Sequence, residues 1–310
     1  MSIDASTLGG TLYVPGIRND LLAVISGQRY PALRSVVICL EDAIAAADVP
    51  RAMANIKAVL GRLSMQQSAM ETLPLRPALF VRPRNPEMLE AISHLPGAGC
   101  IDGYVIPKAT ADVLPAYLIG MHLPHQYILP TIETREAFDP AAMRRLREQL
   151  VAVQERVLTV RIGGNDLLQT LGTRRSPKRT AYDGPLGHVI ASLVATFVPW
   201  NFAMSAPVFE SFSNEALLFE EIERDLEHGL FTKTAIHPGQ VAAIHAAYRV
   251  APADHEAALA VVASGAPAVF AVNGAMCEPA THLRWACATL CRADAFGLSP
   301  LRHDDLSLAS

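Results

Sequence analysis

Short apolar runs recur along the chain, each followed by polar, Gly or Pro residues and then by apolar residues at helical spacing. The runs are continuously apolar rather than alternating, which is typical of parallel strands covered on both faces. The predicted strands lie within residues 11–16, 35–42, 78–85, 103–110, 127–134, 157–166, 201–210 and 232–239. The predicted helices lie within residues 19–28, 50–63, 86–95, 110–122, 140–154, 185–197, 214–230 and 238–248.

This succession of strand–helix units predicts an α/β fold, a (β/α)8 TIM barrel in which helices surround a closed ring of parallel strands. A doubly wound open sheet is the alternative, since it has the same alternation of elements. None of the predicted strands is followed by the Gly-x-Gly-x-x-Gly sequence that binds dinucleotides in such sheets. The barrel is therefore the favoured fold.

The pattern changes after Val250. Residues 253–264 and 278–297 have helical spacing, and residues 268–276 indicate an extended turn around Asn273 and Gly274. This region is too small to bury a core of its own. We expect residues 1–250 to form the barrel domain and residues 251–310 to form a C-terminal helical lid or subunit-contact extension packed on it.

The stretch 184–209 contains no Asp, Glu, Lys or Arg and is long enough to suggest a membrane helix. Pro199, Trp200 and Asn201 interrupt it. We therefore expect a helix of about three turns followed by a buried strand, both inside an α/β protein, and no contact with a membrane.

Composition indicates a folded enzyme of the cytoplasm. The chain has 310 residues, 51% of them hydrophobic, which is enough for one large core. A net charge of −4 with few runs of Lys or Arg argues against a nucleic-acid partner. The five cysteines are scattered without a CxxC pair, as expected for buried thiols in a reducing compartment, and the N-terminal segment has no features of an export signal.

The carboxyl ends of the strands form one face of such a barrel, so polar residues there are expected to meet. Those residues are Arg18, Glu41, Asp42, Arg82, Lys108, Glu133, Asp166, Glu210 and His237. Glu133 and Asp166 end consecutive strands and could together hold one hard cation, because Mg²⁺ takes one or two carboxylates plus water and substrate oxygens. The structural alternative is that each carboxylate caps the helix that follows it.

Gly163 and Gly164 are expected to remove Cβ bulk where a planar substrate lies on the backbone, and their N–H groups can point at its carboxylate. Asn165, beside them, and Pro207, in the seventh predicted strand segment, complete the expected substrate-binding residues.

Arg82 follows an apolar strand and is costly to bury unpaired. It is expected to contact a substrate carboxylate or developing enolate, or alternatively to pair with Glu41 or Asp42. Lys108 could form a Schiff base if burial lowered its pKa. A role in orienting the neighbouring carboxylates is favoured, because a metal pair and a lysine nucleophile are seldom needed together.

Two further features have both a structural and a functional interpretation. His237 is either a strand-end histidine with satisfied hydrogen bonds or a proton-transfer group. The loop 173–179 carries four cations and is either solvated or a site for a phosphate group. Those cations are Arg174, Arg175, Lys178 and Arg179.

The order of several short motifs resembles that of the citrate lyase beta-subunit-like proteins of the HpcH/HpaI aldolase superfamily. The motifs are YVPG, LEDAI, VRPRN, VIPK, PTIET, GGNDL and AIHPGQ, and they span nearly the whole chain. The resemblance implies a (β/α)8 barrel, homotrimers or hexamers, and cleavage or formation of a C–C bond beside a carbonyl, often on an acyl-CoA.

The resemblance also implies roles for individual residues. Mg²⁺ is expected at Glu133 and Asp166, and Arg82 is expected at a 2-oxo acid or its enolate. Glu41, Asp42 and Lys108 would support them. An acid from an adjacent subunit completes the site in several family members, and Glu278 stands where that acid, usually Asp, is found. The histidine base of the aldolase branch has no clear match near the first two strands.

We therefore expect a Mg²⁺-dependent carbon–carbon lyase or aldolase that acts through the enolate of a 2-oxo acid such as pyruvate, glyoxylate or oxaloacetate, with an acyl-CoA as one form of the substrate. Two alternatives remain open. GGNDLLQ also resembles the GTNDL segment of phosphoenolpyruvate-using phosphotransfer barrels. The chain could also be a non-catalytic barrel that binds an acyl-CoA.

Overall fold

Eight parallel strands close into a barrel in chain order in the computed structural model, which describes residues 3–68 and 76–300. The strands are β1 Gly10–Pro15, β2 Ser35–Cys39, β3 Ala78–Arg82, β4 Gly103–Ile106, β5 Tyr127–Ile132, β6 Val160–Ile162, β7 Met204–Ala206 and β8 Thr232–Ala235. Each overlaps one predicted run, and β1 pairs with β8 to close the ring. The predicted (β/α)8 TIM barrel is confirmed, and the open sheet is excluded.

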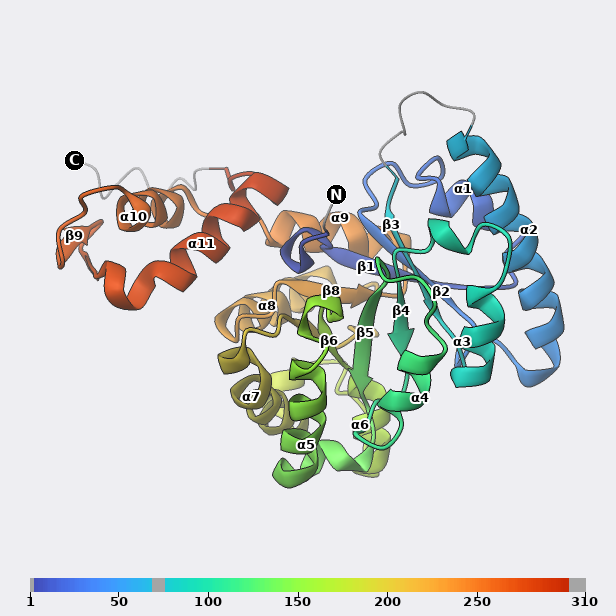
Figure 1. The fold of residues 1–310 in the computed structure, drawn as a ribbon. Helices are drawn as coiled ribbons and strands as arrows, with labels where there is room; N and C mark the ends of the chain where they lie inside the picture. Colours follow the sequence, from blue (N-terminus) through green and yellow to red (C-terminus); the bar gives the residue numbers. More distant parts are fainter. Residues whose placement is uncertain (1–2, 69–75, 301–310) are drawn as a thin grey trace.

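Helices follow the strands and cover the outside of the barrel (Figure 1). The α-helices are α1 Leu21–Ile25, α2 Val49–Ser68, α3 Pro86–Ser93, α4 Leu114–Ile119, α5 Pro140–Val151, α6 Gly164–Thr170, α7 Pro185–Phe197, α8 Glu215–Glu227 and α9 Pro238–Ala247. Short 3-10 helices are η1 Ala5–Thr7, η2 Ala46–Asp48, η3 Ala98–Cys100, η4 Arg135–Phe138, η5 Gln154–Arg156, η6 Ala181–Asp183 and η7 Val198–Trp200.

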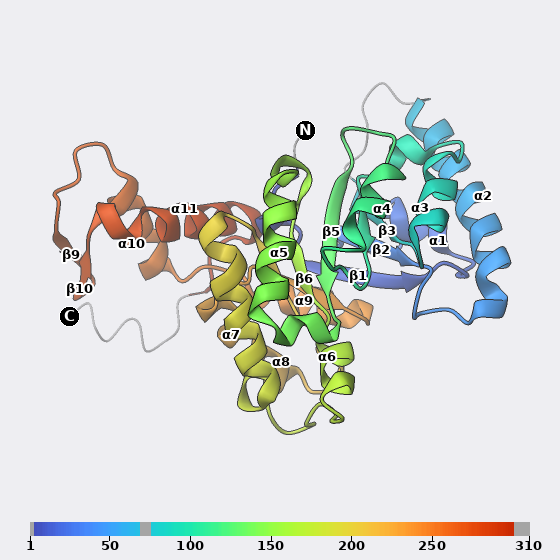
Figure 2. The same cartoon turned by 60° about the horizontal axis from the view of Figure 1, so that its bottom comes forward.

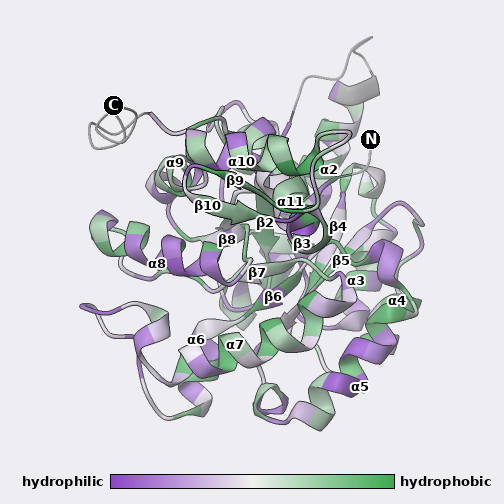
Figure 3. Cartoon of the chain, turned by 90° about the vertical axis from the view of Figure 1, so that its left-hand side faces the viewer, coloured by the Kyte–Doolittle hydropathy of each residue, from purple (hydrophilic) through white to green (hydrophobic). Residues whose placement is uncertain are grey.

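The sequence explains where several helices begin. Asn85 and Asp139 each accept a backbone N–H of the following helix, and a proline occupies the first helical position after each of them. Figure 3 shows hydrophilic and hydrophobic residues alternating along α5 and α8, as expected for helices with one face on the barrel. The charge-free stretch forms α7 and β7, as predicted. No helix in the described part of the chain is both long and apolar enough to cross a bilayer.

The inside of the barrel changes from apolar to polar along the strands. Residues two apart in a strand face the same way. An apolar layer near the amino ends is formed by Leu8, Val37, Phe80, Val105, Leu129 and Leu158. Two positions further along three of these strands stand Cys39, Arg82 and Thr131, which line a cavity. The barrel is therefore filled by apolar side chains near the amino ends of the strands, and polar side chains line a cavity at their carboxyl ends.

The chain after Val250 forms an arm that projects from the barrel (Figures 1 and 2). It consists of α10 Pro252–Val262, the antiparallel strands β9 Phe270–Val272 and β10 Ala275–Cys277, and α11 Pro279–Phe296. Asn273 and Gly274 both have positive φ, as a two-residue hairpin turn requires. The extended turn predicted here is thus a complete hairpin.

The arm leaves the barrel at the face opposite the carboxyl ends of the strands. Its helix α11 contacts η1, which precedes β1, and Val250 bridges to Leu298. The arm has a small apolar cluster of its own, formed by Ala258, Val261, Cys277 and Ala286. None of the arm residues up to 300 lines the cavity within the same chain. The division at residue 250 and the role of the arm stay predictions.

None of the five cysteines forms a disulfide within the part of the chain that the structure describes. Cys39, Cys100 and Cys277 are buried, which agrees with the prediction. The prediction of burial is wrong for Cys287 and Cys291, which are exposed on α11, because α11 belongs to the projecting arm rather than to the barrel.

Candidate functional site

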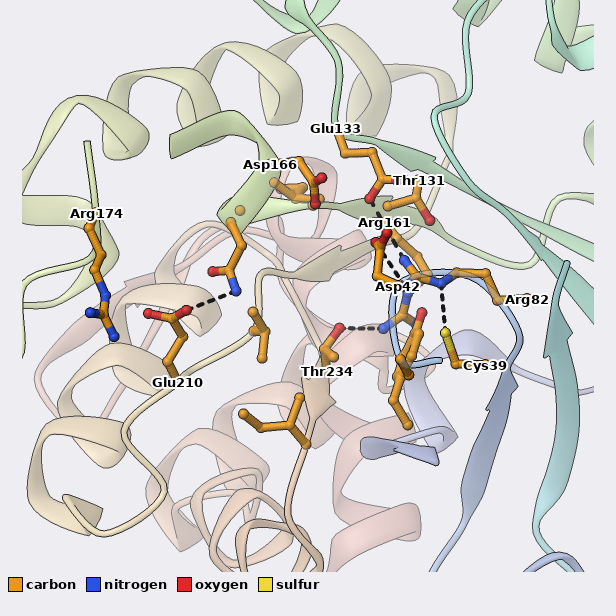
Figure 4. A pocket seen from close by; sticks show the side chains of 18 residues that line it. Cys39, Asp42, Arg82, Thr131, Glu133, Arg161, Asp166, Arg174, Glu210 and Thr234 are labelled. Carbon is orange, nitrogen blue, oxygen red and sulfur yellow. Dashed lines mark hydrogen bonds and ion pairs between the residues drawn. The ribbon is translucent and has the colours of Figure 1, made fainter. Parts of the chain in front are cut away.

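One cavity of about 600 Å³ opens at the carboxyl ends of the strands (Figure 4). The loops after the strands and the last inward-facing strand residues build it. Its lining residues are Tyr13, Cys39, Asp42, Ala43, Arg82, Thr131, Glu133, Arg161, Ile162, Gly163, Gly164, Asn165, Asp166, Arg174, Val208, Glu210, Thr234 and Ile236. Most of the residues predicted to carry function therefore meet in one place.

Glu133 and Asp166 face this cavity from the ends of β5 and β6 (Figure 4). Glu133 is buried, and its Oε1 accepts the backbone N–H of Lys108 at 2.8 Å. Burial raises the pKa of Glu133 to about 7, although the Arg82 guanidinium acts in the opposite direction. Burial and the nearby Asp42 carboxylate also raise the pKa of Asp166. Two carboxyl groups that resist ionisation at one cavity are suited to share a cation.

Neither carboxylate caps a helix, so the structural alternative does not hold. The N-cap residue of α6 is Gly163, and Asp166 lies in the first turn of that helix. The N-cap residue of η4 is Thr134, and its side chain makes no capping hydrogen bond. Glu133 is instead held by the backbone of Lys108, on the neighbouring loop.

Gly163 is required by the close approach of Glu133. A Cβ built on Gly163 would lie 2.6 Å from Oε2 of Glu133, a distance that real Cβ atoms do not show. A Cβ on Gly164 would lie 2.8 Å from the Pro207 ring. Both glycines line the cavity, as predicted, but the bulk they remove would collide with the protein rather than with a substrate. Pro207 lies behind Gly164 and is not among the lining residues.

Arg82 is surrounded by acids at the cavity wall. Its Nη2 lies 3.1 Å from carboxylate oxygens of both Glu41 and Asp42, and its Nη1 lies 4.0 Å from Oε2 of Glu133. Nε donates to Cys39 Sγ at 3.3 Å. The ion pair expected as the structural interpretation is therefore present. Because Arg82 also lines the cavity, it can still face a substrate.

Lys108 orients this group of acids. Its ammonium donates to Glu41, and its backbone N–H holds Glu133. Burial disfavours its charge, but the hydrogen bond and the charge of Glu41 outweigh that effect and raise the pKa of Lys108. A Schiff-base lysine needs a lowered pKa. The geometry thus favours the orienting role over the nucleophile.

The opposite wall of the cavity carries Asn165, Glu210 and Arg174. Asn165 Nδ2 donates to Glu210 Oε1 at 2.9 Å, and Figure 4 shows Arg174 beside Glu210. Arg174 is exposed and belongs to the basic loop. The next residue, Arg175, turns inward instead, where it donates to Glu221 and to the Val208 carbonyl. The loop is thus neither wholly solvated nor wholly available to a phosphate.

His237 has the structural role that was one of its two interpretations. Its Nδ1 accepts the backbone N–H of Gly239 at 3.1 Å at the start of α9, and its ring stacks on Phe212. It does not line the cavity, and neither does Arg18, which pairs with Asp20. Glu278 precedes α11 on the arm, where Thr281 donates to its Oε2. It does not line the cavity of its own chain.

Several residues of the site were not predicted. Tyr13, Thr131 and Thr234 line the cavity, and so does Arg161 on β6. The signal for Arg161 was present in the sequence as a charge inside the apolar run VLTVRIGG. A second missed group lies outside the barrel wall, where Lys233 Nζ donates to Glu221 and Asp225 of α8 at 2.8 Å each.

The residues present fit a hard divalent cation. Two carboxylates supply oxygen ligands, Gly163 leaves room for one of them, and the remaining positions face the cavity. The described residues contain no cluster of three or more His, Cys, Asp or Glu side chains poised for a metal. A cation here would therefore keep open positions for water or substrate.

Comparisons with known proteins agree with this fold. The chain is 26% identical to a (3S)-malyl-CoA thioesterase of Cereibacter sphaeroides, over 95% of this chain and 98% of that protein. CitE of Mycobacterium tuberculosis, in complex with magnesium, acetoacetate and coenzyme A, has a similar structure with a TM-score of 0.66, at 22% identity over 94% of this chain and 99% of that one. A malate synthase of Haloferax volcanii gives a TM-score of 0.63 at 15% identity, over 78% and 73% of the two chains.

The profile of one family, the C–C bond lyases of the TIM-barrel fold, matches residues 2–298. This range covers the strands of the barrel, the site at their carboxyl ends and almost all of the described arm. The chain therefore belongs to the C–C bond lyase family of the TIM-barrel fold.

Proposed function

We propose that this protein is a Mg²⁺-dependent carbon–carbon lyase or aldolase that cleaves or forms a C–C bond through the enolate of a 2-oxo acid. The observation that carries the proposal is the meeting of Glu133, Asp166 and Arg82 at one cavity. Pyruvate and oxaloacetate are the candidate oxo acids that can form an enolate, and glyoxylate, which has no enolisable C–H, is a candidate only as the carbonyl compound that an enolate attacks or that cleavage releases. An acyl-CoA is a candidate for the full substrate, because CitE binds magnesium together with acetoacetate and coenzyme A.

Glu133 and Asp166 would hold the cation through carboxylate oxygens. A bound Mg²⁺ would supply Lewis-acid chemistry by polarising the carbonyl beside the bond that breaks. Arg82 offsets the negative charge that develops on the substrate oxygen, because its guanidinium is fixed at the cavity wall by its acid partners. The backbone of Gly163 and Gly164 forms the surface on which a planar oxo acid would lie.

The proposal is tested by exchange of the methyl protons of pyruvate with deuterated water, followed by NMR. Exchange is expected with Mg²⁺ and not without it. The methyl protons exchange only when the enolate forms, and the cation favours the enolate by polarising the carbonyl. Glu133→Gln and Asp166→Asn should each lower the rate at least ~100-fold. Glu155→Gln, at an exposed residue of η5, is the matched control and should keep the wild-type rate. Exchange that survives both site variants would refute the proposal.

A second candidate function is hydrolysis of an acyl-CoA thioester. It is favoured by the similarity to a (3S)-malyl-CoA thioesterase, which covers nearly the whole of both chains. The two functions are separated by their products from malyl-CoA. A thioesterase releases free coenzyme A and malate, whereas a lyase yields acetyl-CoA and glyoxylate. Release of thiol without glyoxylate would favour the hydrolase.

We further propose that the arm binds a second copy of the chain, in the homotrimer or hexamer that the family resemblance implies. Exposed apolar side chains gather on the arm, as is common at contact surfaces. They are Leu259, Val262, Val269, Met276, Leu283 and Trp285. Such a contact would allow Glu278 to enter the cavity of a neighbouring subunit, which its position in a single chain does not permit.

A further inference from the structure

Arg161 is a buried cation at the inner end of the cavity, and its charge is not used by the proposed reaction. It lies on β6 and is 2% exposed. Nη2 donates to Thr234 Oγ1 at 2.5 Å, as Figure 4 shows, and the guanidinium lies 5.2 Å from the centre of the Tyr13 ring. In the described part of the chain, Nη1 has no hydrogen-bond partner.

Three other cations with little exposed side chain, among the residues that the structure describes, do have acidic partners. Arg82 pairs with Glu41, Asp42 and Glu133; Arg175 pairs with Glu221; Lys233 pairs with Glu221 and Asp225. Arg161 makes no such ion pair with any residue of the described segments. Burial raises the pKa of Tyr13, so the phenol beside it is neutral and supplies no counter-charge. A buried guanidinium without an anion is costly.

Thr131 provides a second unused polar group at the same level. It stands opposite Arg161 in the register of β5 and β6, and both side chains line the cavity. Thr131 is 5% exposed, and its Oγ1 has no hydrogen-bond partner among the described residues. A guanidinium N–H and a hydroxyl side by side can both donate to one carboxylate.

We propose that Arg161, assisted by Thr131, binds a second carboxylate of the substrate, so that the 2-oxo acid half of the substrate is a diacid. This inference rests on the proposed function, which places the carbonyl of the 2-oxo acid at the cation that Glu133 and Asp166 would hold. The same cavity is lined by Arg161 and by that pair.

The test compares ligands that differ only in the distal group. Oxaloacetate is the diacid, and 4-methyl-2-oxopentanoate carries an isopropyl group in place of the distal carboxylate, with a methyl group for each carboxylate oxygen. Affinities are measured by calorimetry with Mg²⁺ on the wild type, Arg161→Met and Arg161→Lys, with pyruvate as the shortest ligand.

The wild type is expected to prefer oxaloacetate ~10- to 100-fold over the methyl analogue. Arg161→Met should abolish the preference while pyruvate affinity changes less than ~3-fold, and Arg161→Lys should restore part of it.

Equal binding of the diacid and its methyl analogue by the wild type would overturn the inference, and this measurement does not depend on whether Arg161→Met folds. A loss of pyruvate and oxaloacetate affinity by the same factor in Arg161→Met would also overturn it, while leaving the proposed lyase intact. If no 2-oxo acid binds with Mg²⁺, the proposed function fails. The inference is then decided by malonate, which must raise the melting temperature of the wild type but not that of Arg161→Met.

Discussion

At the scale of single residues, the proposed cation site requires the close approach of Glu133 to the backbone after β6. Gly163 makes this approach possible, because any Cβ at that position would collide with the Glu133 side chain. Glu133 is also tied to the Lys108 backbone, so it cannot move away without losing a hydrogen bond. The glycine and the carboxylate therefore act as a unit.

Gly163→Ala is expected to lower Mg²⁺-dependent pyruvate exchange at least ~10-fold, because the added methyl group displaces Glu133 from the cavity. Gly61→Ala is the control, since nothing lies within 4 Å of a Cβ there and the position is inside α2. It should keep the exchange rate and stabilise the fold by about 0.5–1 kcal/mol. Wild-type exchange in Gly163→Ala would contradict the proposed placement of Glu133.

Most of the residues at the carboxyl ends of the strands could be predicted from the sequence, because each follows directly after an apolar run. The inward-facing residues inside the runs were missed. Thr131 looks like an ordinary strand position, and the charge of Arg161 inside its apolar run does not show which way the side chain points while the register is unknown. Pro207 and His237 show that a position at a strand end does not by itself bring a side chain into the cavity. Pro207 follows β7 but lies behind Gly164, and His237 follows β8 but caps α9.

At the scale of elements, buried charges join α8 to β8. Lys233 is fully buried, and so are Glu221 and Asp225, its partners one helical turn apart. Tyr182 donates to Asp225 at 2.6 Å, and Arg175 donates to Glu221, so the loop before α7 is attached to the same group. This network links the loop that carries Arg174 to the barrel wall.

Lys233→Met should destabilise the fold by about 3–5 kcal/mol, because it leaves buried carboxylates without their shared cation. The free energy of unfolding in urea measures this change. Arg135→Met is the control, since Arg135 is 87% exposed and pairs with Glu136 at the surface. It should cost less than about 1 kcal/mol. A similarly small effect of Lys233→Met would contradict the assigned role of the network.

The contact between α9 and the arm should depend on pH. His245 of α9 packs against Phe296 of α11, with ring centroids 5.3 Å apart. Burial, assisted by the charge of Arg34, lowers the pKa of His245 to about 4. Between this value and the ordinary pKa near 6.5, the unfolded chain binds a proton that the folded protein does not. Above about pH 6.5 the titration of His245 therefore does not lower the free energy of unfolding. Below that pH it lowers the free energy of unfolding progressively as the pH drops toward 4.

This titration should cost about 1–2 kcal/mol at pH 5 relative to pH 7. His245→Gln, which cannot titrate, should lose that part of the pH dependence. Unfolding in urea at both pH values, for the wild type and the variant, gives the difference directly. The same pH dependence in both proteins would show that His245 is not responsible.

At the scale of the whole molecule, the arm projects from the barrel (Figure 1), and none of its described residues lines the cavity. The sequence predicted the helices of the arm, because their spacing is regular. It could not predict the direction of the arm, which depends on contacts of α11 with η1 at the other end of the chain.

Leu283→Asp is expected to convert the proposed trimer or hexamer into monomers, because Leu283 is 51% exposed on α11 and a charge there would be buried at the contact. Analytical ultracentrifugation gives the mass of each species. Ile119→Asp, at an exposed apolar residue of α4, is the control and should leave the mass unchanged. A wild-type protein that sediments as a monomer would contradict the proposal.

The most direct test of the central claim is a calorimetric titration of Mg²⁺ with and without pyruvate. If Glu133 and Asp166 share one cation that also binds the oxo acid, each ligand should tighten the binding of the other at least ~10-fold. Both Glu133→Gln and Asp166→Asn should remove this coupling. Binding of pyruvate with the same affinity in the presence and absence of Mg²⁺ would contradict the account.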